Sequence, residues 1–404
     1  MTTYDDTLAG TGGQRLVLRI WGPVTLLFVA SAVHTLAFPF TSEAMGYAIA
    51  GVVGLALVLT AILPAYADGR LEFDGRKVWY LVMLVATAIG FFFRIANEAT
   101  VFEFVTSLIR VQTALAALIF FTSTSGTLAV RPAIVTYAAI VAIAVAMTAS
   151  FGLYDYAGIA RPYPFTGVGG VHPSAYAVAA ALVGTVVLKM RGAIGWKLAM
   201  LLGAPLLGLL LAFQVRTTWM MMLAFVSVLL IAAIRRRVDQ RAFSAMLGMS
   251  LAVIVIVVAL LMVFGLGGFD LTTFSSGRTS VYVERLQLIA QRPWPEILFG
   301  TGVGSDSLRS ATWWWEEKDS HNDFLRIAVE QGVICVVAVA AILIGSARRL
   351  TDTVQFAVFA ALVSGSLLSN GLLDRPLLAV LFVSTLAIRD RRLDARGRMP
   401  GAGD

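Results

Sequence analysis

The chain contains three histidines, and one of them has the surroundings that proton transfer requires. His321 stands between Asp319 and Asp323, at the boundary between a long polar segment and an apolar run. Nearby carboxylates can hold an imidazole ring and raise its basicity, as a general base requires. A histidine in a helix is more often a packing residue, and position alone leaves both interpretations open. His321 is nevertheless the strongest candidate for a base.

Arginines in unusual places can supply positive charge to the same chemistry. Arg216 lies in a very short turn between two apolar runs, and Arg278 begins an amphipathic segment. A planar guanidinium binds two phosphate oxygens at once, although an arginine at a membrane boundary often only extends toward water. Arg110 lies within an apolar run, seven residues after Glu103. A structural ion pair and a role in lining a cavity explain Arg110 equally well.

Other features of the polar segments admit more than one explanation. Trp314 is the middle of three adjacent tryptophans, which form either an interfacial anchor or a platform for stacking sugar rings. The glycines of 300–304 resemble a phosphate loop only superficially, because no strand precedes them, and a tight chain reversal explains them better. The sequence shows no carboxylate pair with metal-site spacing and no His/Cys cluster. We therefore expect a reaction without a metal ion or a cofactor.

The composition indicates what must position these residues. Of the 404 residues, 58% are hydrophobic and 14% are charged, whereas a soluble domain carries roughly 25% charged residues. The apolar runs are about 20 residues long, which matches a hydrocarbon core of about 30 Å. These values exclude a soluble enzyme, a disordered chain and a compact nucleic-acid binder. We expect an all-α integral membrane protein, with the lipid bilayer as its surroundings and no nucleic-acid partner.

About twelve apolar runs are predicted to span the membrane as helices. They are 17–37, 44–64, 77–94, 101–122, 134–154, 172–189, 194–214, 216–234, 243–266, 321–346, 351–369 and 372–388. The resulting plan has nine spans in 1–266, a long outer loop at 267–320, three spans in 321–388 and a basic tail at 389–404. The loop is expected to contain an amphipathic helix from Thr279 to Arg292, with Tyr282, Leu286 and Ile289 on its apolar face.

The distribution of basic residues predicts the orientation of these spans. Most of the 31 Lys and Arg residues fall in one alternate set of polar segments, which includes 235–237 and the tail. Cytoplasmic loops carry such an excess. Both termini are therefore predicted to be cytoplasmic, and the segments 155–171 and 267–320 to lie outside. Cys335, the one cysteine, is expected to be a packed thiol.

A series of motifs across roughly 155–345 resembles the O-antigen ligase and O-antigen polymerase superfamily of bacterial membrane glycosyltransferases. The motifs are Arg161 with Gly167 and His172-Pro173-Ser174, then Phe213-Gln214-Val215-Arg216-Thr217-Thr218, Ser276-Gly277-Arg278, the run from Pro295 to Gly304, Ser320-His321-Asn322-Asp323-Phe324-Leu325 and Glu330-Gln331-Gly332. Val215 departs from the family's pattern, which commonly has a small residue before the arginine.

The resemblance implies an activity and a set of site residues. The family moves a preassembled glycan from undecaprenyl diphosphate to a hydroxyl of a saccharide or glycolipid acceptor, with inversion and without a metal ion. Arg216 and Arg278 would bind the diphosphate, and His321 would take the acceptor proton. The expected location is the bacterial cytoplasmic membrane, with the active site on its outer side. Further substrate contacts are expected from Arg161, His172, Arg110, Asn322 and Trp314.

The sequence leaves two alternatives open. A ligase and a polysaccharide polymerase differ in the acceptor, and one sequence does not distinguish them. The competing class is a transporter or flippase of lipid-linked or anionic substrates, for which twelve spans are also common. Transporters usually show two related halves, and no such symmetry is evident in this sequence. We therefore expect an enzyme of cell-envelope biogenesis.

Overall fold

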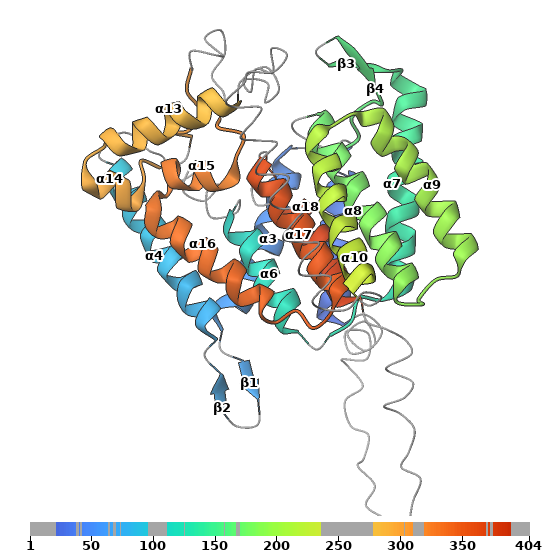
Figure 1. Cartoon of the computed structure of the whole chain (residues 1–404), viewed down its shortest axis with the longest axis horizontal. Helices are drawn as coiled ribbons and strands as arrows, with labels where there is room; N and C mark the ends of the chain where they lie inside the picture. Colours follow the sequence, from blue (N-terminus) through green and yellow to red (C-terminus); the bar gives the residue numbers. More distant parts are fainter. Residues whose placement is uncertain are drawn as a thin grey trace, which may run out of the picture. The chain divides into compact units, whose positions relative to one another are not determined.

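Figure 1 shows the computed structural model, in which most of the described residues lie in helices. It describes residues 22–37, 40, 43–63, 65–67, 70–72, 74–95, 111–124, 126–156, 158–166, 170–235, 278–302, 304–309, 319–368, 371 and 375–388. The chain divides into two compact units. Unit 1 comprises Met1–Leu59, Ala117–Val215 and Pro376–Asp404, and unit 2 comprises Thr60–Ala116 and Arg216–Arg375.

Five helices of the described residues are long and apolar enough to cross a membrane. They are α4 (Gly75–Ile95), α7 (Val130–Phe151), α8 (Val171–Met190), α9 (Trp196–Phe213) and α10 (Arg216–Arg235). The other predicted spans that the structure describes form apolar helices too: α2 (Pro23–Ala37), α3 (Glu43–Ile62), α6 (Thr113–Ser123), α16 (Gly332–Ala347), α17 (Thr353–Leu368) and α18 (Pro376–Val383), which the 3-10 helix η3 (Ser384–Ala387) continues. The structure is thus compatible with an all-α membrane protein.

Helix α8 forms the centre of unit 1. Nearly all of its residues are buried, and many are alanine. Small side chains let neighbouring helices approach closely, and a Cβ at Gly184 would overlap the hydroxyl of Tyr137 on α7. Helices α9 and α18 also pack on α8. An antiparallel hairpin of β3 (Tyr154–Tyr156) and β4 (Ile159–Arg161), absent from our all-α prediction, connects α7 to α8.

Helices α4 and α16 form one antiparallel pair in unit 2 (Figure 1). Near the start of α16, the Sγ atom of Cys335 lies 3.8 Å from Oγ1 of Thr87, which belongs to the second half of α4. Near the end of α16, Gly345 packs against the side chain of Arg76 at the start of α4. Cys335 is fully buried, as predicted for a packed thiol.

Helices α10 and α17 form a second antiparallel pair. Gly365, near the end of α17, lies against Met221 in the second turn of α10, and a Cβ at Gly365 would come within 2.8 Å of the methionine sulfur. The start of α10 therefore lies beside the end of α17. This contact brings Arg216, the first residue of α10, to the same end of the pair as Leu368.

Basic residues gather at the opposite end of unit 2, where α4 begins and α16 finishes. Asp74 accepts a hydrogen bond from Nε of Arg76 at 2.8 Å, and its Oδ2 atom lies 3.4 Å from Arg349. Lys77 donates to the carbonyl of Leu63. A second antiparallel hairpin, β1 (Ala65–Ala67) with β2 (Arg70–Glu72), precedes this cluster and was likewise not predicted.

The predicted span at 321–346 is wrong in one respect, because the structure divides it into α15 (Asp323–Glu330) and α16. Gln331 ends α15, and Gly332 has a φ of 84°. A Cβ at Gly332 would overlap the carbonyl of Leu298, so the helix breaks where another part of the backbone passes close by.

The predicted amphipathic helix exists as α13 (Arg278–Gln291), and the short helix α14 (Trp294–Phe299) follows it. The buried face of α13 differs from the predicted one. Val281 and Arg285 are buried, whereas Leu286 is 58% exposed. An ion pair draws Arg285 inward, and a periodicity count of apolar residues does not register such a contact. Residues 267–277 and 310–318 of the predicted loop lie outside the described residues.

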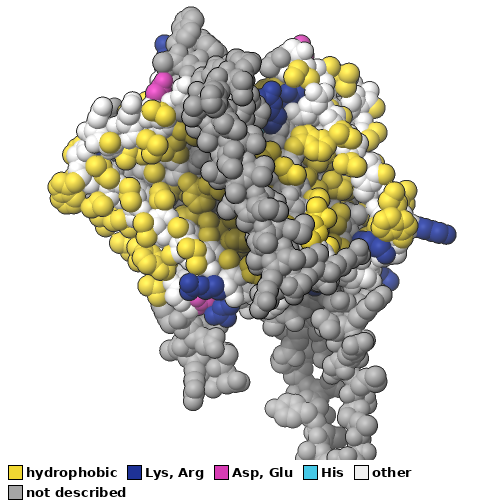
Figure 2. All heavy atoms as spheres, viewed as in Figure 1, with side chains coloured by type: hydrophobic (Ala, Val, Ile, Leu, Met, Phe, Trp, Pro, Cys, Tyr) yellow, Lys and Arg dark blue, Asp and Glu magenta, His cyan; other side chains and the backbone are white. Residues whose placement is uncertain are grey.

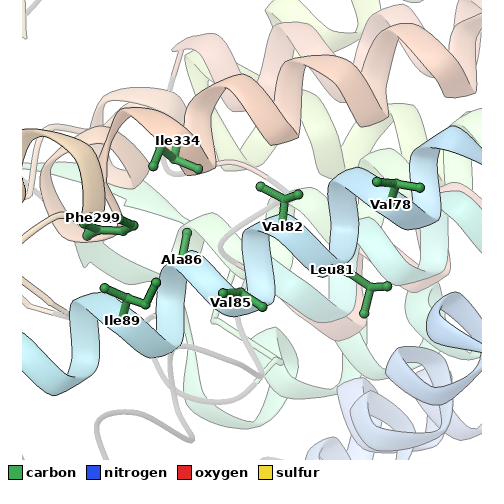
Figure 3. A pocket seen from close by; sticks show the side chains of 8 residues that line it. All are labelled: Val78, Leu81, Val82, Val85, Ala86, Ile89, Phe299 and Ile334. Carbon is green, nitrogen blue, oxygen red and sulfur yellow. The ribbon is translucent and has the colours of Figure 1, made fainter.

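Large apolar side chains cover the sides of several helices, as Figure 2 shows. Val85 on α4 and Leu223 on α10 are each 58% exposed. A groove between α4, α14 and α16 is lined only by hydrophobic residues (Figure 3): Val78, Leu81, Val82, Val85, Ala86, Ile89, Phe299 and Ile334. Apolar surface on span-length helices is suited to lipid contact, and the groove offers no group that could do acid–base chemistry.

Candidate active site

The candidate active site is built around His321, which precedes α15. Its Nδ1 atom lies 3.1 Å from Oδ1 of Asp319, which is hydrogen-bonding distance. A neutral imidazole that donates through Nδ1 carries its lone pair on Nε2. The side chain is 32% exposed, so the ring is held on one side and still reaches the surface. This geometry is what a general base requires.

The backbone of His321 is held in an unusual conformation. His321 has a φ of 50°, and Gln214 is the other non-glycine residue of the described residues with a positive φ. Such a conformation is costly for a residue with a Cβ and persists where the surroundings fix it. Here Asp319 accepts the N–H of His321 at 3.2 Å, and the hydroxyl of Tyr282 donates to its carbonyl at 3.3 Å.

A buried ion pair fixes the residue before the histidine. Asp306 is fully buried, and its Oδ1 atom lies 3.0 Å from Nε of Arg285 on α13. Its other oxygen accepts the N–H of Ser320 at 2.7 Å. Burial raises the pKa of the Asp306 carboxyl above its ordinary value, while the bonds from Ser320 and the charge of Arg285 act in the opposite direction. The pair joins α13 to the segment that carries His321.

Asn322 begins α15 and connects it to the end of α17. Its side-chain oxygen accepts the N–H groups of Phe324 and Leu325 at 3.0 Å, which is the usual role of asparagine at a helix start. Its side-chain nitrogen donates to the carbonyl of Leu367 at 2.8 Å. These hydrogen bonds fix the start of α15 next to His321. The prediction that Asn322 contacts the substrate stays a prediction.

Arg278 reaches the same place from α13, which contacts α15 (Figure 1). One of its terminal nitrogens donates to the carbonyl of Leu368 at 2.7 Å, one residue beyond the acceptor of Asn322. The guanidinium has further N–H groups, which is why an arginine can hold a carbonyl and still bind an anion. Arg278 and Asn322 thus donate hydrogen bonds to neighbouring carbonyls at the end of α17.

Arg216 lies at this end of unit 2 as well. It is exposed at the start of α10, and the packing of Met221 against Gly365 aligns that start with the end of α17. We call the region with Arg216, Arg278, His321 and Leu368 the site end of unit 2. The preceding Val215, at the position where the related motif commonly has a small residue, is buried.

A glycine-rich turn wraps the last turn of α15. The N–H groups of Thr301 and Gly302 donate to the carbonyls of Val329 and Glu330, at 3.2 and 2.8 Å. Gly300 has a φ of 76°, and a Cβ there would overlap the carbonyl of Glu330. The glycines therefore allow two backbone segments to touch, in agreement with the chain reversal that the sequence indicated.

Two other predicted site residues, Arg161 and His172, belong to unit 1. Arg161 is 8% exposed, and its Cζ atom lies 5.0 Å from the ring centroid of Tyr156. The ring of His172 packs edge-on against the ring of Tyr156, with 5.9 Å between the two ring centroids. Within the described residues, Nε of Arg161 has no hydrogen-bond partner. The contacts join β3, β4 and the start of α8.

The remaining predicted contacts, Arg110 and Trp314, lie outside the described residues. Among the residues that are described, no group of three or more His, Cys, Asp or Glu side chains is placed to hold a metal ion. The expectation of a reaction without a metal ion or cofactor stays a prediction.

Sequence reasoning missed two ion pairs that shape the site. Arg285 and Asp306 are distant in sequence, and no local spacing connects them. Arg326 and Glu330 stand four residues apart, a spacing that joins charges on one face of a helix. Two charges inside a predicted membrane span could have indicated that this part of the span was a separate helix.

Comparison with known protein families and with curated proteins finds no match for this chain.

Proposed function

We propose that the chain is a membrane glycosyltransferase that moves a preassembled glycan from undecaprenyl diphosphate to a hydroxyl of a saccharide acceptor. The observation that carries this proposal is the site end of unit 2, where His321 is held by Asp319 and where Arg278 and Arg216 also lie. An oriented imidazole at the same end of one unit as two guanidinium groups suits a reaction that removes a proton from one reactant and develops negative charge on the leaving group of the other.

In the proposed reaction the acceptor hydroxyl attacks the anomeric carbon of the glycan. Nε2 of His321 takes the hydroxyl proton as the new C–O bond forms. The bond between the anomeric carbon and the diphosphate oxygen breaks, and its electron pair leaves with the diphosphate. Arg216 and Arg278 stabilise the charge that develops there. One displacement of this kind inverts the configuration at the anomeric carbon.

We further propose that about twelve helices span a bacterial cytoplasmic membrane, with both termini cytoplasmic and His321 on the outer side. The placement of basic residues supports this orientation. Arg76, Lys77 and Arg349 lie where α16 ends, and His321 lies just before α15, which leads into the start of α16. Helix α16 has 16 residues and is about 24 Å long. Basic residues favour the cytoplasmic side.

The proposal is tested with the purified full-length protein in lipid vesicles. The donor is a glycan repeat on undecaprenyl diphosphate, and the acceptor is either a second carrier-linked repeat or a glycolipid. Longer carrier-linked products would identify a polymerase, and a glycosylated glycolipid would identify a ligase. Movement of the intact donor across the bilayer without any transfer would contradict the proposal and favour a transporter.

A further inference from the structure

Arg326 and Glu330 on α15 belong to a chain of ion pairs that includes His321. The proposed reaction gives these two residues no role. The NH1 atom of Arg326 lies 3.5 Å from Oδ2 of Asp319, whose other oxygen faces the imidazole. The Nε atom of the same arginine lies 3.2 Å from Oε1 of Glu330. The charges therefore alternate from His321 through Asp319 and Arg326 to Glu330.

The far end of this chain is fixed by the glycine-rich turn. Oε1 of Glu330 also accepts the N–H of Gly304 at 2.9 Å, and the carbonyl of Glu330 accepts the N–H of Gly302. Glu330 and Arg326 are 6% and 8% exposed. Charges buried to this extent need partners, and they interact more strongly than charges in water. Arg326 and Glu330 thus form a buried pair of opposite charges, and Asp319 connects this pair to the partly exposed imidazole.

We propose that Arg326 and Glu330 are positioning residues that set the proton affinity of His321 through Asp319. This inference rests on the proposed role of His321 as a base. Asp319 holds the ring and favours its protonated form, and Arg326 opposes this effect because it places a positive charge on the other side of the same carboxylate. Glu330 neutralises Arg326 and so restores the influence of Asp319. The arrangement keeps the imidazole able to accept a proton and to release it afterwards.

The proposal predicts opposite effects on the pKa of His321 for two substitutions in this chain of ion pairs. Arg326→Gln removes a positive charge and should raise the pKa of His321, whereas Glu330→Gln removes a negative charge and should lower it. Each shift should be about half a pH unit or more, as expected for unit charges within several ångströms in a partly shielded site. The double variant should return toward the wild-type value. Arg326→Lys keeps the charge and should shift the pKa least.

A merely structural role does not produce this pattern, because loosening of α15 would change the pKa of His321 in the same direction in both variants. Glu330→Gln is the milder change, since a glutamine oxygen can still accept the N–H of Gly304. The other titratable groups on the elements around His321 stay unchanged in the Arg326 and Glu330 variants; they are Arg278, Tyr282, Glu284, Arg285, Arg292, Glu296, Asp306, Arg309 and Asp323.

The test is a titration of the histidines by nuclear magnetic resonance, with full-length protein labelled with ¹⁵N at histidine and held in lipid nanodiscs. Only three histidine rings contribute signals, and the spectrum of His321→Gln identifies those of His321. Arg309→Gln and Glu296→Gln are matched controls, because each removes one charge outside the chain. Thermal unfolding of each variant verifies that it is folded.

Opposite shifts that cancel in the double variant would support the proposal. Shifts in the same direction, or shifts no larger than those of the two controls, would overturn it. If Arg326→Gln does not fold, Glu330→Gln alone decides, since an unchanged or raised pKa of His321 contradicts the proposal. The titration needs no substrate, so a normal pattern in a protein without transfer activity would overturn the proposed function and leave this charge coupling intact.

Discussion

Oδ1 of Asp319 holds His321 in two ways, through Nδ1 of the ring at 3.1 Å and through the backbone N–H at 3.2 Å. One carboxylate oxygen thus orients both the side chain and the strained backbone that carries it. Because the ring and the backbone share one anchor, the direction of Nε2 depends on Asp319. The candidate base is therefore positioned by a residue two places earlier in the chain.

Replacing the anchor should impair the base without removing it. Asp319→Asn keeps the size of the side chain, but its amide group can donate to Nδ1 and so favours the wrong tautomer of His321. A positioned base contributes roughly 10²–10⁴-fold, and we expect Asp319→Asn to lose about 10–100-fold of the transfer rate. The measurement is the initial rate of glycan transfer in vesicles. Asp155→Asn, an exposed change on β3, is the control, and an Asp319→Asn rate equal to that of the control would refute the role of Asp319.

The charge of Arg278 should not be sufficient for its proposed role. Arg278→Lys retains the positive charge but loses the planar set of N–H groups that can hold the carbonyl of Leu368 and an anion together. We expect a loss of transfer of about 10-fold or more, with weaker use of the carrier-linked donor. A donor titration of initial rates measures it, with the exposed Arg309→Lys as the matched control. Equal rates for Arg278→Lys and wild type would remove Arg278 from the diphosphate site.

Two glycines of the same turn should differ strongly in their tolerance of a side chain. Both Gly300 and Gly304 have positive φ, and the ψ of Gly300 is −179°, so alanine costs about 1–3 kcal/mol of backbone strain at either position. A Cβ at Gly300 would also overlap the carbonyl of Glu330, whereas a Cβ at Gly304 meets nothing within 4 Å. Gly300→Ala should therefore reduce the free energy of unfolding by about 3 kcal/mol or more, and Gly304→Ala by less. Denaturant titrations in detergent compare the variants, and equal losses would mean that the turn does not pack on α15 as described.

Asp74 should make stability fall in acid. Burial opposes ionisation of Asp74, but the hydrogen bonds and the charge of Arg76 outweigh it and hold the pKa below its ordinary value of 3.8. The unfolded chain then binds more protons at this site than the folded chain as the pH falls below about 3.8. The stabilisation is complete above that pH and is lost as the pH falls through the lowered folded pKa.

Asp74→Asn removes this contribution and so reduces the acid-dependent part of the change in Tm. The comparison is the Tm of wild type and variant, measured well above and well below pH 3.8. The difference between the two proteins should shrink at the lower pH. A constant difference across this range would show that the Asp74–Arg76 contact does not depend on the charge of Asp74.

The sequence predicted the bounds of two long apolar helices closely. The bounds of α8 and α10 are within a residue or so of the predicted spans at 172–189 and 216–234. Apolar length could not reveal the break at Gly332, because that break depends on contact with the distant backbone at Leu298. The two hairpins were missed for a related reason, since strands of three residues are too short to show a periodic pattern.

The sequence also identified His321, Arg278 and Arg216 as residues of interest, yet it did not reveal how they are held. Arg285 and Asp306 are joined through space, and the pairing of a helix residue with a turn residue leaves no regular spacing in the chain. Arg326 and Glu330 have the four-residue spacing of a pair on one face of a helix. Their connection to His321, however, depends on the segment that brings Asp319 beside α15.

The most direct test of the central claim is a single-turnover measurement with the full-length protein in vesicles, comparing wild type with His321→Gln. Wild type should release one undecaprenyl diphosphate for each glycosylated acceptor formed. His321→Gln should bind the carrier-linked donor as tightly as wild type and form product about 10²–10⁴-fold more slowly, while His34→Gln should behave as wild type. Product formation by His321→Gln at the wild-type rate would contradict the account.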